Sequence, residues 1–225
     1  MADYGIIDAD AWPSRERCGT PAPLKINPQR VRRTALAAMK ETTNSGKPAS
    51  WHIFPKGFHM TFYDGSAPVF IRTLNALSAI LTKAEAHAAA NNIAPSDLLE
   101  ARLHPTMYPL TKQVQLACDF SGKACARFTQ TELPVMADTE TTFAQLQARI
   151  KKVLSNIEAL PPAKYEGAEK RDITFPVGPG QTMTVTGQQF LNHSAMPQFF
   201  FHCTTAYDIL RHKGVELGKR DFLGV

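Results

Sequence analysis

The chain has 225 residues, of which 44% are hydrophobic and 20% are charged, which is typical of a globular protein with one domain and an extension. Its apolar runs are far shorter than the roughly 20 residues that a membrane helix requires. The N-terminal stretch "MADYGIIDADAW" is acidic and lacks the basic start and apolar core of a secretory signal. These features predict a cytoplasmic protein with no membrane partner.

The net charge of +5 is unevenly distributed along the chain. Residues 1–59 carry nine Lys/Arg and five Asp/Glu, a net charge of +4, whereas residues 60–225 carry 16 and 15, a net charge of +1. A nucleic-acid-binding domain normally presents a basic patch or stripe. Because the larger part of the chain is nearly neutral, we expect no nucleic-acid partner.

Residues 1–59 differ from the rest of the sequence in having scattered Pro, Gly, Ser and Asn and no sustained hydrophobic period. Such a segment cannot bury enough apolar surface to offset its loss of conformational entropy. We therefore expect residues 1–59 to be a mostly disordered N-terminal extension. Residues 60–225 are expected to form a helical-bundle domain.

Three long segments have apolar residues at alternating steps of three and four, the period of an amphipathic helix. The first begins at an N-cap at Ser66, with Pro68 in its first turn, and ends at Asn91-Asn92. The second begins near Leu110, and the third runs from about Thr139 to the Pro161-Pro162 pair. A short helix, "SDLLEARL", follows the first. Together they predict a helical bundle.

The segment before the last helix changes to a period of two, which predicts a small β-hairpin over "ITFPVGPGQTMTV". Thr186 and Gln189 have the spacing of a capping box that opens the fourth long helix. Pro197 should distort that helix, because it lacks the amide hydrogen that would bond to the carbonyl four residues back. Gly214 is a suitable C-cap, and the remaining residues are expected to trail off as an extended tail.

Two histidines on the last helix, His202 and His212, are candidates for a functional site. They are ten residues apart, about 15 Å along a helix, so they cannot share one metal ion. A bundle metal site usually takes two ligands at i and i+3 or i+4, but Thr205 and Ala206 occupy those positions after His202. His212 is expected on the surface, and His202 at the edge of the core with a backbone or Gln partner.

Other polar residues could complete a ligand-binding site around His202. His104 lies in the proline-bracketed loop "HPTMYP", and Gln113 lies beside the inward face of the second long helix. His193 precedes the Pro197 distortion, and Tyr207 belongs to an aromatic set that could line a pocket. The interior cysteines are expected to be reduced, small core residues.

Five stretches carry a resemblance to a known family: "FYDGSAPVFIRTL", "HPTMYPLTKQVQLACD", "ADTETTFAQLQARI", "YEGAEKRDITFPV" and "FFFHCTTAYDILRHKGVELGK". From about Met60 onward the chain resembles the DUF1993 family of uncharacterised proteins, within the DinB/YfiT-like four-helix superfamily. The resemblance implies an all-α, DinB-like four-helix bundle with a small β-hairpin before the last helix. It also implies a possible homodimer.

The resemblance also bears on metal binding. Better-known members of the superfamily look like metalloproteins with one histidine on the second helix and a pair four apart on the last. His202 matches the first of that pair, Ala206 replaces the second, and Gln113 or Gln115 stands at the second-helix position. A divalent metal held by His202 would therefore lack two of its three ligands.

Two functions from different classes are compatible with these residues. The first is an uncharacterised cytoplasmic helical-bundle protein that binds a small molecule or a protein partner. The second is a metal- or thiol-dependent transferase or hydrolase, DinB-like, that uses His202 with His104 or His193.

Overall fold

The computed structural model describes residues 60–132 and 135–225. The predicted disorder of residues 1–59 concerns a segment outside this range. The described residues from Met60 to Val225 belong to one compact unit. All structural statements below refer to this unit.

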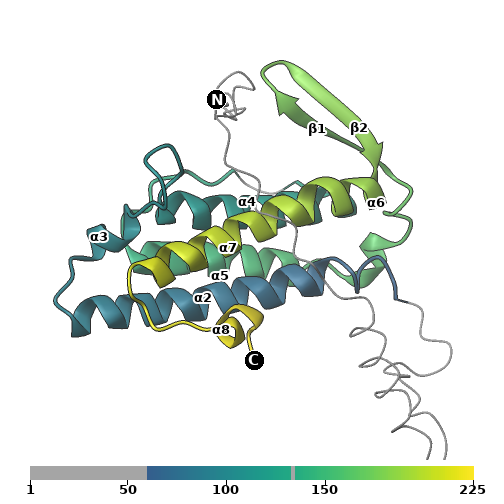
Figure 1. Ribbon diagram of the computed structural model, residues 1–225. Helices are drawn as coiled ribbons and strands as arrows, with labels where there is room; N and C mark the ends of the chain where they lie inside the picture. The colour runs from purple at the N-terminus through teal and green to yellow at the C-terminus, as the bar shows by residue number, and fades with distance from the viewer. Residues whose placement is uncertain (1–59, 133–134) are drawn as a thin grey trace, which may run out of the picture. The chain divides into compact units, whose positions relative to one another are not determined.

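Four long helices build the bundle (Figure 1): α2 (Ala67–Ala90), α4 (Leu110–Thr129), α5 (Phe143–Glu158) and α7 (Met196–His212). Helix α2 packs against α5, α5 against α4, α4 against α7, and α7 returns to α2. The ring of contacts encloses a single core of apolar side chains. The predicted four-helix bundle is therefore confirmed.

The three-and-four spacing of the sequence becomes the buried face of each helix. On α2, Phe70, Leu74, Leu77 and Leu81 are all 2% exposed or less, as the stripe predicts. The helix ends with Asn91 as its C-cap, and Asn92 follows with a φ of 54°. Asparagine tolerates this left-handed conformation better than most residues.

Helix α5 begins later than expected, because its N-cap is Thr142 rather than a residue near Thr139. The Thr142 hydroxyl accepts from the Gln145 amide, and the Gln145 side chain accepts from the Thr142 amide. This reciprocal capping box satisfies two amide donors that the first turn would leave unpaired.

The predicted hairpin consists of β1 (Asp172–Gly178) and β2 (Gln181–Thr186), paired antiparallel with Ile173 opposite Val185. Gly187 follows at the start of α6 (Gly187–Phe190), whose capping box of Thr186 and Gln189 is as predicted. A β-carbon at Gly187 would overlap the carbonyl oxygen of Ala168. Glycine therefore lets the hairpin approach the preceding loop closely.

The predicted distortion near Pro197 takes the form of a π-helical turn, Leu191–Ala195, between α6 and α7. The Met196 amide donates to the Leu191 carbonyl, five residues back. Such single π turns inside α-helices are one of the recognised sources of helix bending. The wider turn accommodates a segment in which Pro197 provides no amide hydrogen.

Three shorter helical segments complete the fold: α3 (Pro95–Leu99), η2 (Pro162–Tyr165) and α8 (Lys219–Leu223). The expectation of an extended tail was wrong. Val215 and Leu217 are buried, so the tail is anchored by apolar contacts. Lys83 on α2 forms an ion pair with Asp221 at 2.5 Å, which holds α8 against α2.

Candidate functional site

The interaction between His202 and Gln113 joins helices α7 and α4 at the edge of the core. Nδ1 of His202 lies 2.7 Å from Oε1 of Gln113. The Nε2 amide of Gln113 donates to the Tyr108 carbonyl at 3.1 Å. His202 is 9% exposed and Gln113 is 2% exposed, so both polar groups meet their partners away from bulk water. This Gln partner is one of the two kinds predicted for His202.

The contact to Tyr108 determines which nitrogen of His202 carries the proton. A carbonyl oxygen only accepts hydrogen bonds, so the amide nitrogen of Gln113 must face Tyr108 and its oxygen must face His202. The Nδ1–H of His202 therefore donates to Gln113. In a neutral imidazole this leaves an unshared electron pair on Nε2.

Burial keeps the imidazole neutral. Desolvation, together with the positive charge of Lys112, lowers the pKa of His202 to about 4, well below the usual value of about 6.5. At neutral pH, Nε2 is therefore a hydrogen-bond acceptor and a potential ligand. Among the hydrogen bonds of the described residues, none involves this nitrogen. The fully buried atoms without a partner there are Arg149 Nε and Tyr165 Oη, so Nε2 keeps some access to solvent.

Two phenyl rings flank the His202 imidazole. Phe120 of α4 stacks on it with a centroid separation of 5.4 Å and an interplanar angle of 6°. Phe201 approaches it edge-on at 5.2 Å and is itself 57% exposed. The accessible nitrogen is therefore set among aromatic surfaces on the seam between α4 and α7.

The structure brings Gln113 to His202 but gives the other candidates different surroundings. His104 is exposed and its Nδ1 lies 2.9 Å from the Thr106 hydroxyl. His193 is exposed on the π-helical turn. Tyr207 packs against Phe222 with the centroids 5.9 Å apart. In the described part of the chain, no hydrogen bond, ion pair or ring contact joins these three residues to His202.

The residues around His202 do not fit the three-histidine metal site that the resemblance implies. Ala206 has no donor atom, and Gln113 already uses its oxygen for His202 and its nitrogen for Tyr108. Gln115 instead donates to Glu140 at 2.8 Å. Within the described ranges, no cluster of three or more His, Cys, Asp or Glu residues could hold a metal ion.

The three described cysteines, Cys118, Cys125 and Cys203, are free and buried. Burial raises the pKa of Cys118 and of Cys125 to about 12 and also raises that of Cys203. A nucleophilic cysteine requires the opposite, an accessible thiol with a lowered pKa. These three residues therefore match the predicted role of small core side chains and do not suit thiol chemistry.

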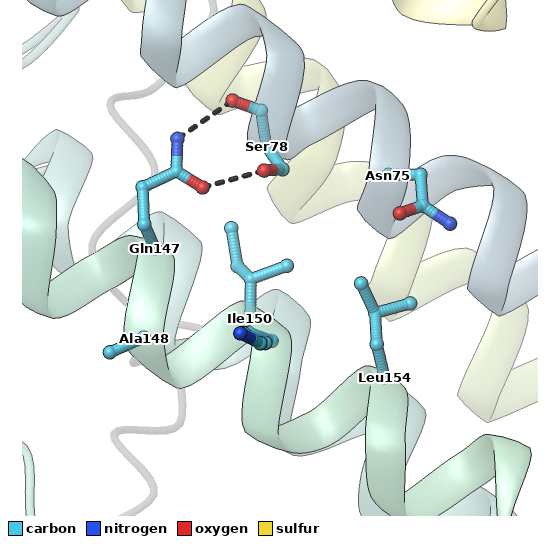
Figure 2. Close-up of a pocket in the computed structure, with 7 residues that line it drawn as sticks. Asn75, Ser78, Gln147, Ala148, Ile150 and Leu154 are labelled. Carbon is cyan, nitrogen blue, oxygen red and sulfur yellow. Dashed lines mark hydrogen bonds between the residues drawn. The ribbon is translucent and has the colours of Figure 1, made fainter.

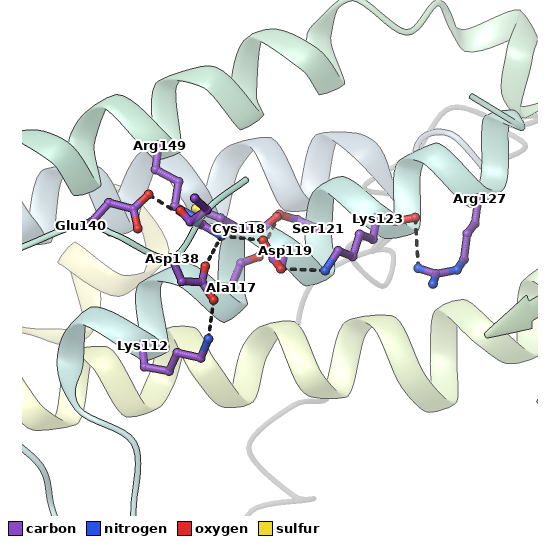
Figure 3. A network of polar contacts seen from close by, with 11 residues as sticks. Lys112, Ala117, Cys118, Asp119, Ser121, Lys123, Arg127, Asp138, Glu140 and Arg149 are labelled. Atoms are coloured by element: carbon purple, nitrogen blue, oxygen red, sulfur yellow. Dashed lines mark hydrogen bonds and ion pairs between the residues drawn. The ribbon is translucent and has the colours of Figure 1, made fainter. Parts of the chain in front are cut away.

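Sequence reasoning missed a polar cluster around Arg149 on α5 (Figure 3). The guanidinium of Arg149 contacts Asp119 on α4 at 2.7 Å, Asp138 at 3.0 Å and Glu140 at 2.9 Å, and donates to the Ala137 carbonyl at 3.2 Å. The cluster fastens the segment before α5 to two helices. One signal could have found it: Arg149 lies three residues after Leu146 and four before Val153, on the apolar face of α5.

Within the described residues, every helix is too short or too polar to cross a bilayer.

Known proteins resemble this chain in both sequence and fold. A crystal structure of a DinB family member protein from Shewanella denitrificans is 40% identical, with a TM-score of 0.68 over 72% of this chain and 92% of that chain. No curated protein matches the sequence. The model of DUF1993, a domain of unknown function, matches residues 62–223. Because this match covers most of the chain, the chain belongs to the DUF1993 family.

Proposed function

We propose that this protein binds a small organic molecule through a hydrogen bond that the ligand donates to Nε2 of His202. The observation that carries the proposal is the relay from Tyr108 through Gln113, which leaves the unshared electron pair of His202 on Nε2. A lowered pKa keeps that nitrogen unprotonated at neutral pH. These hydrogen bonds are already formed in the free protein, so binding of the ligand does not have to organise them.

The surroundings of His202 favour an aromatic ligand. Phe120 and the exposed Phe201 present ring surfaces, and aromatic pairs contribute about 0.5–1.5 kcal/mol beyond their buried area. A ligand that carries a hydroxyl or N–H group on an aromatic ring can satisfy both features. A ligand with no donor would leave Nε2 unpaired and would lose the energy of one buried hydrogen bond.

Phenol and anisole test this proposal directly, because methylation removes the donor and keeps the ring. Phenol should shift the Nε2 resonance of His202 saturably in ¹⁵N NMR, and anisole should bind at least fivefold more weakly. His202→Phe should abolish the phenol-specific effect, whereas His212→Phe on the exposed end of α7 should leave it unchanged. Equal binding of the two probes, or an unchanged His202 resonance, would rule the proposal out.

The rival function is a metal-dependent transferase or hydrolase. The free electron pair on Nε2 favours it, because a metal-binding histidine characteristically donates its other N–H to a fixed acceptor. Gln113 provides such an acceptor. Metal analysis of the purified protein separates the two: stoichiometric Zn or Ni that disappears in His202→Ala would replace the binding proposal.

The same proposal includes a cytoplasmic location and assembly as a homodimer without nucleic acid. The near-neutral charge of residues 60–225 supports the absence of a nucleic-acid partner. Light scattering of the full chain tests the dimer. Retardation of an RNA or DNA fragment at physiological salt that depends on residues 60–225 would refute the charge argument.

A further inference from the structure

A groove on another face of the bundle lies between α2 and α5 and has a volume of about 330 Å³ (Figure 2). This size falls at the lower end of the range for small-molecule sites, roughly 300–1,000 Å³. The residues that line it are Asn75, Ser78, Gln147, Ala148, Ile150, Lys151 and Leu154. None of them belongs to the His202 site.

Most hydrogen-bonding groups of this groove are already paired within the protein. The Ser78 hydroxyl donates to Gln147 Oε1 at 2.5 Å, and Gln147 Nε2 donates to the Ser78 carbonyl at 2.9 Å (Figure 2). The Asn75 amide donates to the Ile71 carbonyl at 3.0 Å. A sugar or a nucleotide base would need donors and acceptors that are free. The groove is therefore poorly suited to such polar ligands.

The groups that remain available are apolar side chains, the side-chain oxygen of Asn75 and one positive charge. Of the apolar lining residues, Ile150 is buried, Leu154 is half-buried and Ala148 is exposed, and Lys151 is the one charged residue of the lining. Among the ion pairs of residues 60–132 and 135–225, none involves Lys151. Its ammonium group can therefore take an anionic partner.

We propose that the groove between α2 and α5 binds a free medium-chain carboxylate, with the acyl chain along Ile150 and Leu154 and the carboxylate beside Lys151. The positive charge of Lys151 favours a ligand with one negative group. Because Ser78 and Gln147 are hydrogen-bonded to each other, the rest of the ligand is expected to be apolar. Each methylene buried in the groove strengthens binding by up to about fourfold. The charge at Lys151 adds about threefold to fivefold, because an exposed ion pair is weak.

Octanoate is the probe for this site, titrated into the ¹⁵N-labelled full chain below its micelle concentration. We expect saturable shifts at Ser78 and Leu154 and none at His202. Lys151→Gln should weaken binding about threefold to fivefold. Lys152→Gln is the matched control, because Lys152 is the next residue and does not line the groove. It should bind octanoate as the unaltered protein does.

Hexanoate and 1-octanol complete the test. Hexanoate should bind more weakly than octanoate, by up to about 16-fold for two methylenes, and 1-octanol should bind about as weakly to the unaltered protein as octanoate does to Lys151→Gln. The proposal is overturned if the shifts do not saturate, if the two lysine variants behave alike, or if 1-octanol binds as tightly as octanoate. The proposal is likewise overturned if the protein binds lipid vesicles but does not bind free octanoate.

Discussion

Replacing Arg149 with Met should destabilise the protein more than any exposed substitution on α5. The Arg149 side chain is 1% exposed, and its guanidinium forms ion pairs with Asp119, Asp138 and Glu140. Methionine fills much of the same space but provides no positive charge. The three carboxylates would then share a partly buried site with less compensation.

The expected loss is about 3 kcal/mol in the free energy of unfolding. Removing one partner of a buried ion pair typically costs about 3–5 kcal/mol, because the other charge stays desolvated. Two of the carboxylates retain lysine partners, Asp119 with Lys123 and Asp138 with Lys112. Asp138 is also 35% exposed. Both facts place the loss at the lower end of the range.

Urea unfolding of the full chain at pH 7, followed by circular dichroism, measures this difference. The midpoint should fall while the slope of the transition stays the same, which would show a change in stability alone. Lys152→Met is the matched control on the same helix and should change stability by no more than about 0.5 kcal/mol. If Arg149→Met lowered the free energy of unfolding as little as the control does, the cluster would not contribute to stability and the reasoning would be refuted.

The free energy of unfolding should fall by about 2 kcal/mol between pH 7 and pH 5 because of His202, since the unfolded imidazole gains a proton below about pH 6.5 and the folded one only below about pH 4. Urea titrations at both pH values should show that His202→Gln loses this component. The same pH dependence of stability in the variant and the unaltered protein would contradict the prediction. Gly187→Ala should lower stability by about 3 kcal/mol through overlap with Ala168, whereas Gly65→Ala, with no atom closer than 3.8 Å to the added carbon, should be tolerated in thermal unfolding. Thr142→Ala should cost about 1 kcal/mol through loss of the cap of α5, and an unchanged unfolding midpoint would show that the cap is dispensable.

The fold follows from the sequence wherever one period runs over several turns. The α2 stripe from Phe70 to Ala88 and the alternation around Ile173 each identify an element, because burial of one face requires that spacing. The C-terminal tail shows the limit of this reasoning. Val215 and Leu217 are too few to establish a period. The contacts of α8 are with distant residues, such as the ion pair of Asp221 with Lys83, more than 130 residues away.

The candidate site is predictable only in part, for a similar reason. Helical geometry places His202 at the edge of the core and separates it from His212, because both residues lie on one helix. The partner Gln113 lies on another helix, 89 residues away in the sequence, so its contact depends on how α4 and α7 pack. Arg149 shows the same limit, since its carboxylate partners lie on α4 and on the irregular segment before α5.

The packing of α7 against α4 also explains why one further histidine would not restore a metal site. Ala206 is 0% exposed, as is Ala117 on α4, so both positions lie in the packed core. A histidine at position 206 would have to displace neighbouring core atoms, and overpacking of this kind typically costs about 1–3 kcal/mol. Gln113 would still be engaged with Tyr108 and His202. Restoring three ligands therefore requires changes on both helices, and the present residues favour a neutral acceptor at His202 over a metal-binding cluster.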